Sequence, residues 1–206
     1  MRFWQKGIPS CNSKFNAMNV VLIGMPGSGK STFGKYVAQI LNMPFIDTDS
    51  EICKNHGEIK DIFERGGEKL FREIELKECE RIGQSQNAVI ATGGGVVKSI
   101  EAMRALYKNS LIVYLQCDTS LLAKRVLSDE IARPLLNGSE SEIIAKLEQM
   151  QLERSQLYLK YAQIVLNVSG ILESRNLLQS ELSDQLGALY IELLLALEQR
   201  VHKKFE

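Results

Sequence analysis

Residues 20–32 read VVLIGMPGSGKST, a short apolar run followed by a glycine-rich turn and the start of a helical pattern. Gly24 to Ser31 matches the phosphate-loop pattern G-x-x-x-x-G-K-[ST] at every specified position. In such a loop, backbone N–H groups converge on a phosphate, and the helix that follows adds the positive end of its dipole. The sequence therefore predicts a bound nucleotide here, with contacts from Gly27, Ser28, Gly29, Lys30, Ser31 and Thr32.

Two side chains of this loop carry specific expectations. Lys30 is expected to reach the outer phosphates of the nucleotide, where it acts as a catalytic group. The Ser31 hydroxyl is expected to hold Mg²⁺. A glycine turn with an incidental lysine is the alternative, and the strand pattern before the loop and the helix pattern after it argue against that reading.

Further strand and helix patterns alternate along the chain. Besides 20–23, the strand candidates are 44–46, 88–91, 111–115 and 164–166. The helical patterns are 30–41, 58–82 with a break at Gly66-Gly67, 97–108, 118–128 and 140–160. This alternation favours a single α/β domain with a parallel sheet covered on both faces, and we place that domain at residues 18–175.

The two ends of the chain differ from this pattern. Residues 1–17 contain basic residues but no acidic one. This composition suggests a transit peptide, or a translation start assigned upstream of the true one. We expect this segment to be disordered. Residues 176–206 carry one long leucine-rich helical pattern. We expect that helix to pack on the domain, so that the protein is a monomer; a dimer contact is the alternative.

Composition excludes several classes of protein. The chain has 25 Lys and Arg residues and 25 Asp and Glu residues in a total of 206. It therefore has no net positive charge that would attract nucleic acid or an anionic membrane. No apolar run approaches the roughly 18 residues that span a bilayer. The four cysteines lack the spacing of a metal site or a disulfide framework, which favours reduced thiols in a cytoplasmic protein.

Two carboxylates follow the second strand candidate. Asp47 and Asp49 are spaced i, i+2 about 17 residues after Lys30, and the carboxyl ends of parallel strands line a common crevice. One of the two can support the water shell of Mg²⁺, while the other can accept a proton from an attacking hydroxyl. A solvated turn is the alternative.

Arginines and glycines complete the candidate site. Arg72 lies one helical turn before Glu75, which can orient its guanidinium toward a carboxylate, although a surface ion pair is the plainer interpretation. Gly93-Gly94-Gly95 ends a strand, which suggests a close approach of ligand to backbone, with a flexible turn as the alternative. Arg133 lies in a polar stretch that we predict to be a mobile lid over the phosphates.

These motifs, in this order, resemble the shikimate kinase family of P-loop kinases. The resemblance covers roughly residues 19–168 and rests on an ordered set of motifs. The set is GMPGSGKST (24–32), DTD (47–49), GEKLFREIE (67–75), GGG (93–95), RPLL (133–136) and ERSQLY (153–158). It implies a five-stranded parallel sheet between helices with a closing lid, and transfer of a phosphoryl group from ATP to the 3-hydroxyl of shikimate.

The resemblance also implies roles for individual residues. Asp49 would bind the substrate hydroxyls and act as base, and Asp47 would lie near Mg²⁺. Arg72 and Arg154 would grip the substrate carboxylate, and Gly93 to Gly95 would line the substrate pocket. Arg133 would approach the transferred phosphate, and Arg125 would pack on adenine.

Three other functions remain as alternatives. A gluconate kinase shares the phosphate loop, and its substrate is also a polyhydroxylated carboxylate. A nucleoside monophosphate kinase would need arginines for a second phosphate and a slot for a base. A non-catalytic nucleotide-binding regulator has no physical need for all of Lys30, Ser31, Asp47, Asp49 and Arg133.

Overall fold

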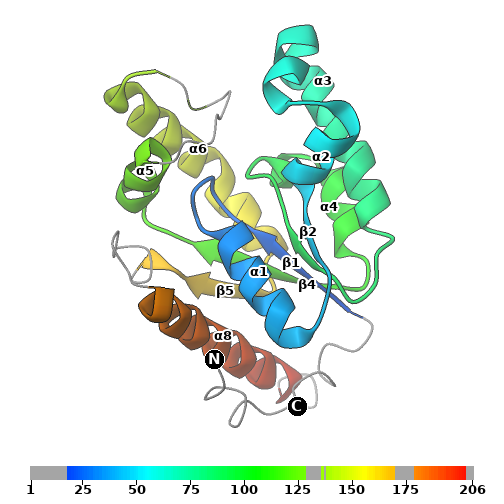
Figure 1. Cartoon of the computed structure of the whole chain (residues 1–206), viewed down its shortest axis with the longest axis vertical. Coiled ribbons are helices and arrows are strands. Elements are labelled where there is room, and N and C mark those ends of the chain that lie inside the picture. The colour runs from blue at the N-terminus through cyan, green and yellow to red at the C-terminus, as the bar shows by residue number, and fades with distance from the viewer. Residues whose placement is uncertain (1–17, 129–135, 137, 170–178, 203–206) are drawn as a thin grey trace.

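A five-stranded, all-parallel sheet forms the centre of the protein (Figure 1). The computed structural model describes residues 18–128, 136, 138–169 and 179–202. The strands are β1 (Asn19–Ile23), β2 (Phe45–Asp47), β3 (Val89–Ala91), β4 (Ser110–Gln116) and β5 (Ile164–Asn167), in the spatial order β2-β3-β1-β4-β5. All five residues of β1 are buried, because this strand is paired on both edges and covered on both faces.

Helices cover the two faces of this sheet (Figure 1). They are α1 (Lys30–Leu41), α2 (Thr48–His56), α3 (Ile59–Ile82), α4 (Ile100–Tyr107), α5 (Thr119–Ser128), α6 (Glu140–Tyr161) and α8 (Gln179–His202), with one 3₁₀ turn, η3 (Val96–Lys98). Helices α1 and α8 contact each other on one face, while α4 and α6 lie against β4 on the other. No helix in the described part of the chain has the length and hydropathy needed to cross a membrane.

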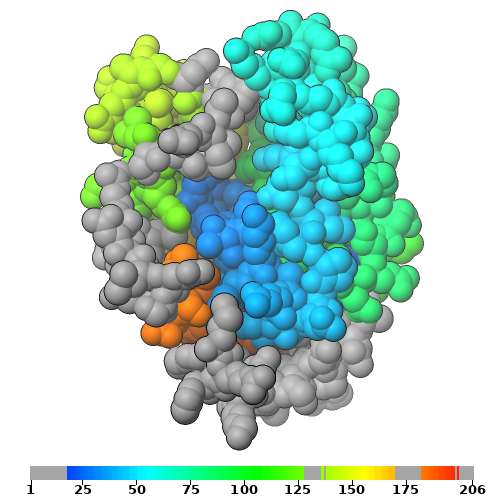
Figure 2. Space-filling view, viewed as in Figure 1, coloured from blue at the N-terminus to red at the C-terminus, as the bar shows by residue number. Residues whose placement is uncertain are grey.

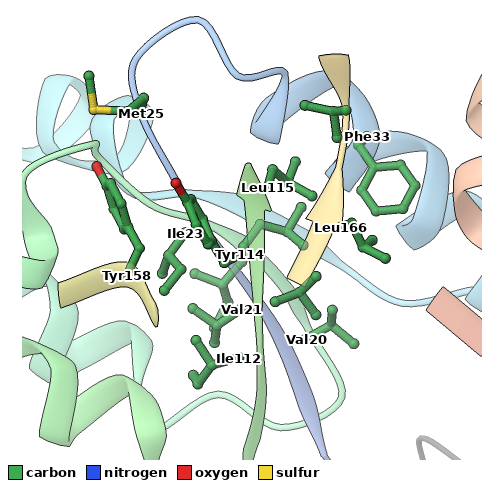
Figure 3. Close-up of a cluster of buried hydrophobic side chains, with 14 of the residues drawn as sticks. Val20, Val21, Ile23, Met25, Phe33, Ile112, Tyr114, Leu115, Tyr158 and Leu166 are labelled. Carbon is green, nitrogen blue, oxygen red and sulfur yellow. The ribbon is translucent and has the colours of Figure 1, made fainter. Parts of the chain in front are cut away.

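The main core lies on both sides of β4. Figure 3 shows Tyr114 and Tyr158 together on one side of this strand, with Phe33 and Leu166 on the other. The two tyrosine rings stack with their centroids 4.9 Å apart. Offset stacking of this kind adds to the free energy gained from burying the rings.

Helices α2 and α3 have a small apolar cluster of their own. It consists of Ile52, Ile62 and Phe71, with partly buried neighbours such as Phe63 packed around them. Within α3, Gly67 has a φ of 65°, which interrupts the helical geometry at the predicted break. The two helices therefore form a unit at one end of the sheet, cyan in Figure 2, whose apolar cluster is separate from the main core. Only the C-terminal part of α3 reaches the main core, through Cys79 and Ile82.

The fold expected from the sequence is confirmed: five parallel strands lie between two layers of helices. The sequence did not predict α2, which begins directly at the end of β2. Residues 129–135 and 137, which include Arg133 of the predicted lid, and the N-terminal segment 1–17 lie outside the described residues. The proposed limits of the domain at 18 and 175 therefore stay a prediction.

Candidate active site

A cavity of about 990 Å³ opens at the carboxyl ends of the strands. Its walls come from the loop after β1, the start of α2, the middle of α3, the glycines after β3, and residues of α5 and α6. The sequence-predicted residues among its lining are Gly27, Gly29, Lys30, Ser31, Thr32, Asp47, Asp49, Arg72, Gly93, Gly94, Gly95, Arg125 and Arg154. These residues, which come from five of the six motifs and include Arg125, thus meet in one place.

The phosphate loop has a shape that only glycine permits. Gly24 has a φ of 150°, and a Cβ there would lie 2.7 Å from the carbonyl oxygen of Leu115. Gly27 and Gly29 also have positive φ angles, and Gly29 caps α1. The Lys30 ammonium donates to the carbonyls of Gly24 and Met25 at 3.0 and 2.9 Å. The loop is therefore already folded around the lysine.

Asp47 joins the phosphate loop to α2. Its Oδ1 accepts hydrogen bonds from the backbone N–H groups of Asp49 and Ser50, so it is the N-cap of this helix. Its Oδ2 accepts a 2.6 Å hydrogen bond from the Ser31 hydroxyl. A hydroxyl and a carboxylate side by side offer the hard oxygen ligands that Mg²⁺ prefers. The site thus fits the predicted ion.

Asp49 is a partly buried acid in the first turn of α2, and its Oδ1 atom is buried. Burial raises the pKa of its carboxyl from 3.8 to about 6, and the negative charges of Asp47 and Glu75 add to the effect, while Lys30 and Arg72 oppose it. Its Oδ1 has no hydrogen-bond partner among the described residues. A buried acceptor with a pKa near neutrality is suited to receive a proton or a hydroxyl hydrogen bond from a ligand.

The three glycines after β3 lie directly against these acids. The N–H of Gly93 donates to the buried Thr48 hydroxyl at 2.9 Å, which ties this loop to α2. A Cβ on Gly93 would lie 2.8 Å from Asp49 Oδ1 and 3.0 Å from Glu75 Oε1. The absence of a side chain at this position therefore leaves room for the two carboxylates.

Arg154 approaches the same loop from α6. Its guanidinium donates to the carbonyl of Gly94 at 3.2 Å, and the phenol of Tyr158, one turn further on, donates to the same oxygen at 2.5 Å. Arg154 is only 4% exposed, and its Nε is buried without a partner among the described residues. A buried donor of this kind favours an acceptor supplied by a ligand.

Arg72 is held by carboxylates on either side. Its Nη1 donates to Glu75 at 2.6 Å, and its Nε and Nη2 donate to Glu68 at 3.2 and 3.0 Å. Burial works to lower the pKa of Arg72, but the two carboxylates outweigh it and raise that pKa, so the guanidinium stays cationic. The predicted pairing with Glu75 exists, and it is not a surface ion pair, because the Glu75 side chain is 1% exposed.

Of the remaining predicted residues, Arg125 on α5 lines the cavity, whereas Ser28 is buried and does not line it. Arg133 lies outside the described residues, so its place relative to the cavity stays a prediction. Thr48, Glu68 and Tyr158, which hydrogen-bond to residues of the site, were not predicted from the sequence. Glu68 lies four residues before Arg72 and Tyr158 four after Arg154, a helical spacing that was available as a signal.

Comparisons with known proteins agree on one family. The family model described as shikimate kinase matches residues 26–203. Among curated proteins, a shikimate kinase of Caldicellulosiruptor bescii is 46% identical over 136 residues, which cover 65% of this chain and 78% of that protein. A shikimate kinase of Moorella thermoacetica is 39% identical over 153 residues, which cover 74% of this chain and 86% of that protein.

Two solved structures that share this fold are also shikimate kinases. Shikimate kinase from Bacteroides thetaiotaomicron is 30% identical with a TM-score of 0.75, covering 85% of this chain and 98% of that one. Shikimate kinase from Acinetobacter baumannii, solved in complex with shikimate, is 28% identical with a TM-score of 0.73, covering 90% and 97%.

Proposed function

Because this chain belongs to the shikimate kinase family, we propose that it transfers the γ-phosphoryl group of ATP to the 3-hydroxyl of shikimate, giving shikimate 3-phosphate and ADP. One observation carries the proposal beyond the family name. The cavity joins a phosphate loop to a second compartment, in which two arginines, Arg72 and Arg154, and the acid Asp49, with its buried Oδ1, surround the glycines after β3.

The charges of this compartment suit shikimate. That molecule has one carboxylate and three hydroxyls, so its pocket needs cationic donors for the first and an acceptor for the second. Arg72 and Arg154 supply donors, and charge-assisted hydrogen bonds from guanidinium to carboxylate are among the strongest available in water. Asp49 supplies the acceptor, and the side-chain-free surface of Gly93 to Gly95 lets the ring approach the backbone.

In the proposed reaction, Asp49 accepts the proton of the attacking hydroxyl as the new O–P bond forms. Its pKa of about 6 leaves it mostly ionised at neutral pH, which a base requires. Lys30 stabilises the charge on the outer phosphate oxygens. We propose that Ser31 and Asp47 hold Mg²⁺, which when bound neutralises phosphate charge. Arg125 is proposed to contact the adenine, and Arg133 the transferred phosphate.

The test is an assay of ADP release with purified protein, ATP, Mg²⁺ and one acceptor at a time. Shikimate, gluconate and a nucleoside monophosphate are the three acceptors, since the sequence left all three open. Turnover with shikimate alone is the expected result. Turnover with gluconate or the nucleoside monophosphate, and none with shikimate, would overturn the proposal. ATP binding without turnover on any acceptor would favour a regulator.

A substitution of Arg72 tests whether this residue binds shikimate. Arg72→Ala should raise the KM for shikimate by removing a charge-assisted pair worth roughly 1.5–3 kcal/mol, that is about ten- to hundredfold. The KM for ATP should stay within about twofold, because Arg72 hydrogen-bonds to Glu68 and Glu75 and not to the phosphate loop. An unchanged KM for shikimate would count against Arg72.

We further propose that the protein acts as a monomer in the cytoplasm. Gel filtration tests the oligomeric state, and cell fractionation tests the location.

A further inference from the structure

The guanidinium of Arg72 is already occupied by a carboxylate on one edge. Its Nε and Nη2 both donate to Oε1 of Glu68, at 3.2 and 3.0 Å, while Nη1 donates to Glu75 at 2.6 Å. Arginine binds a carboxylate through two adjacent N–H groups, and the Nε–Nη2 edge is one of the two edges that allow this. Glu68 thus takes a position that an incoming carboxylate would use.

The two carboxylates differ in how firmly they are held. The Glu75 side chain is 1% exposed and belongs to the buried wall of the cavity, whereas that of Glu68 is 45% exposed. A pair spaced i, i+4 with one partner half exposed contributes little to stability, so moving it costs little. Glu68 is therefore the carboxylate of the two that a ligand can displace.

Glu68 also has a second cation within reach. The ammonium of Lys98, on η3, lies 4.0 Å from the same Oε1. The hydrogen bond from Arg72 lowers the pKa of Glu68, partial burial opposes this, and the charges of Arg72, Lys98 and Arg154 lower it further. Glu68 thus lies in the positive field of both arginines that are proposed to bind the substrate carboxylate.

We propose that Glu68 is an internal, displaceable carboxylate that occupies Arg72 in the empty site, competes with the substrate carboxylate, and turns to Lys98 when substrate binds. This proposal rests on the proposed function. Glu68 keeps the arginine paired and oriented, and it makes every small anion displace a charged group before it can bind. Glu68 thereby reduces occupation of the pocket by inorganic anions at the cost of some affinity for substrate.

Removing the charge of Glu68 should tighten the binding of shikimate. Loss of a residue that binds shikimate would weaken it. Glu68→Gln keeps the shape and one acceptor oxygen but removes the charge. We expect the KM for shikimate to fall about two- to fivefold, the range that an exposed ion pair supports. Inhibition by sulfate, competitive with shikimate, should become stronger by a similar factor, and the KM for ATP should not change.

The matched control is Glu73→Gln, an exposed residue on the same helix with the same change of charge. A general electrostatic effect would lower the KM for shikimate in both variants, and that result would overturn the proposal. A rise or no change in this KM with Glu68→Gln would also overturn it, because Glu68 would then bind substrate or merely orient Arg72. Turnover of shikimate by the wild-type protein tests the proposed function separately.

A second substitution tests the role of Lys98. In the wild-type background, Lys98→Met removes the alternative partner of Glu68, so the KM for shikimate should rise about two- to fivefold. In the Glu68→Gln background, the same substitution should have no effect, because the displaced side chain no longer carries charge. Equal effects in both backgrounds would mean that Lys98 acts on substrate directly, and this would overturn the exchange of partners.

Discussion

The phenol of Tyr158 donates a 2.5 Å hydrogen bond to the carbonyl of Gly94, the same oxygen that receives a 3.2 Å hydrogen bond from Arg154. Tyr158 is fully buried, and its ring stacks on Tyr114. Arg154 and Tyr158, one turn apart on α6, therefore both hold the loop of Gly93 to Gly95. We therefore expect the position of Arg154, the proposed substrate ligand, to depend on Tyr158, which does not line the cavity.

Tyr158→Phe should test this dependence. The variant keeps the stacked ring but removes one donor from Gly94, and a hydrogen bond of this kind contributes about 1 kcal/mol to stability. We expect a modest decrease in the free energy of unfolding and a several-fold rise in the KM for shikimate, with the KM for ATP unchanged. Urea denaturation and steady-state kinetics measure these quantities. Tyr161→Phe, on the same helix, is the control; equal kinetic changes in both variants would refute a specific role for Tyr158.

Asp49 should cost stability in the protein without ligand. Folding raises the pKa of its carboxyl from 3.8 to about 6, so protonation of this carboxyl favours the folded state over the unfolded state. This contribution to the free energy of unfolding is complete below about pH 4 and is lost as the pH rises through 6. At pH 7.5 the ionised carboxyl therefore costs up to about 3 kcal/mol. Asp49→Asn should raise the free energy of unfolding at pH 7.5 while removing most turnover. A variant less stable than the wild type, or one that keeps full activity, would contradict this.

The pH profile of the reaction should follow the same group. As the pH falls through about 6, Asp49 becomes protonated and loses its capacity as a base, so kcat/KM for shikimate should decline with an apparent pKa near 6. The profile is measured between pH 5 and pH 9 in buffers of constant ionic strength. A flat profile across pH 5–7 would mean that another group takes the proton.

Asp47 caps α2 and is proposed to hold Mg²⁺, and substitution can separate the two roles. Asn is as good an N-cap as Asp, so Asp47→Asn should leave the stability of α2 nearly intact while weakening the site for Mg²⁺. Asp47→Ala should lose both, including about 1 kcal/mol from the cap. We expect the Mg²⁺ concentration for half-maximal activity to rise in both variants, and the free energy of unfolding to fall in the second alone. A normal Mg²⁺ dependence in Asp47→Asn would exclude this residue from the metal site.

Much of the fold follows from short-range pattern. Runs such as Leu111 to Leu115 are apolar at every position, which is typical of strands buried on both faces, and they predicted the parallel sheet. The phosphate loop is equally local, because its conformation depends on glycines at fixed spacing. Helix α2 was missed because Asp47, Thr48 and Asp49 directly follow a strand and suggest a turn. Their side chains are in fact the cap and first turn of a helix.

Contacts between distant segments were harder to predict. Arg72 with Glu75 is a local helical pair, and the sequence indicated it, but the burial of Glu75 depends on the approach of the loop at Gly93 from another strand. The donation by Tyr158 to Gly94 joins residues 64 positions apart. Nothing in residue type or spacing specifies such a pair, because it arises only when α6 packs beside the end of β3.

The polar network around Glu78 gives a last prediction, about the stability of the unit formed by α2 and α3. The Glu78 side chain is 7% exposed and accepts hydrogen bonds from Asn55 and Arg81, with His56 3.0 Å away. Burial tends to raise the pKa of Glu78, but these hydrogen bonds outweigh it and lower that pKa. The stability gained is therefore present above the ordinary pKa of glutamate and is lost as the pH falls below it.

Glu78→Gln should thus be less stable than the wild type at pH 7, by roughly 1–3 kcal/mol, since hydrogen bonds to a charged group are lost. The difference in the free energy of unfolding should shrink toward pH 4, because the carboxyl of the unfolded wild-type chain then takes up a proton that folding has to release. Glu80→Gln, exposed on the same helix, is the control and should show no such dependence. Urea denaturation at the two pH values measures both variants. A stability difference that stays constant with pH would mean that shape, and not the charge of Glu78, holds α2 against α3.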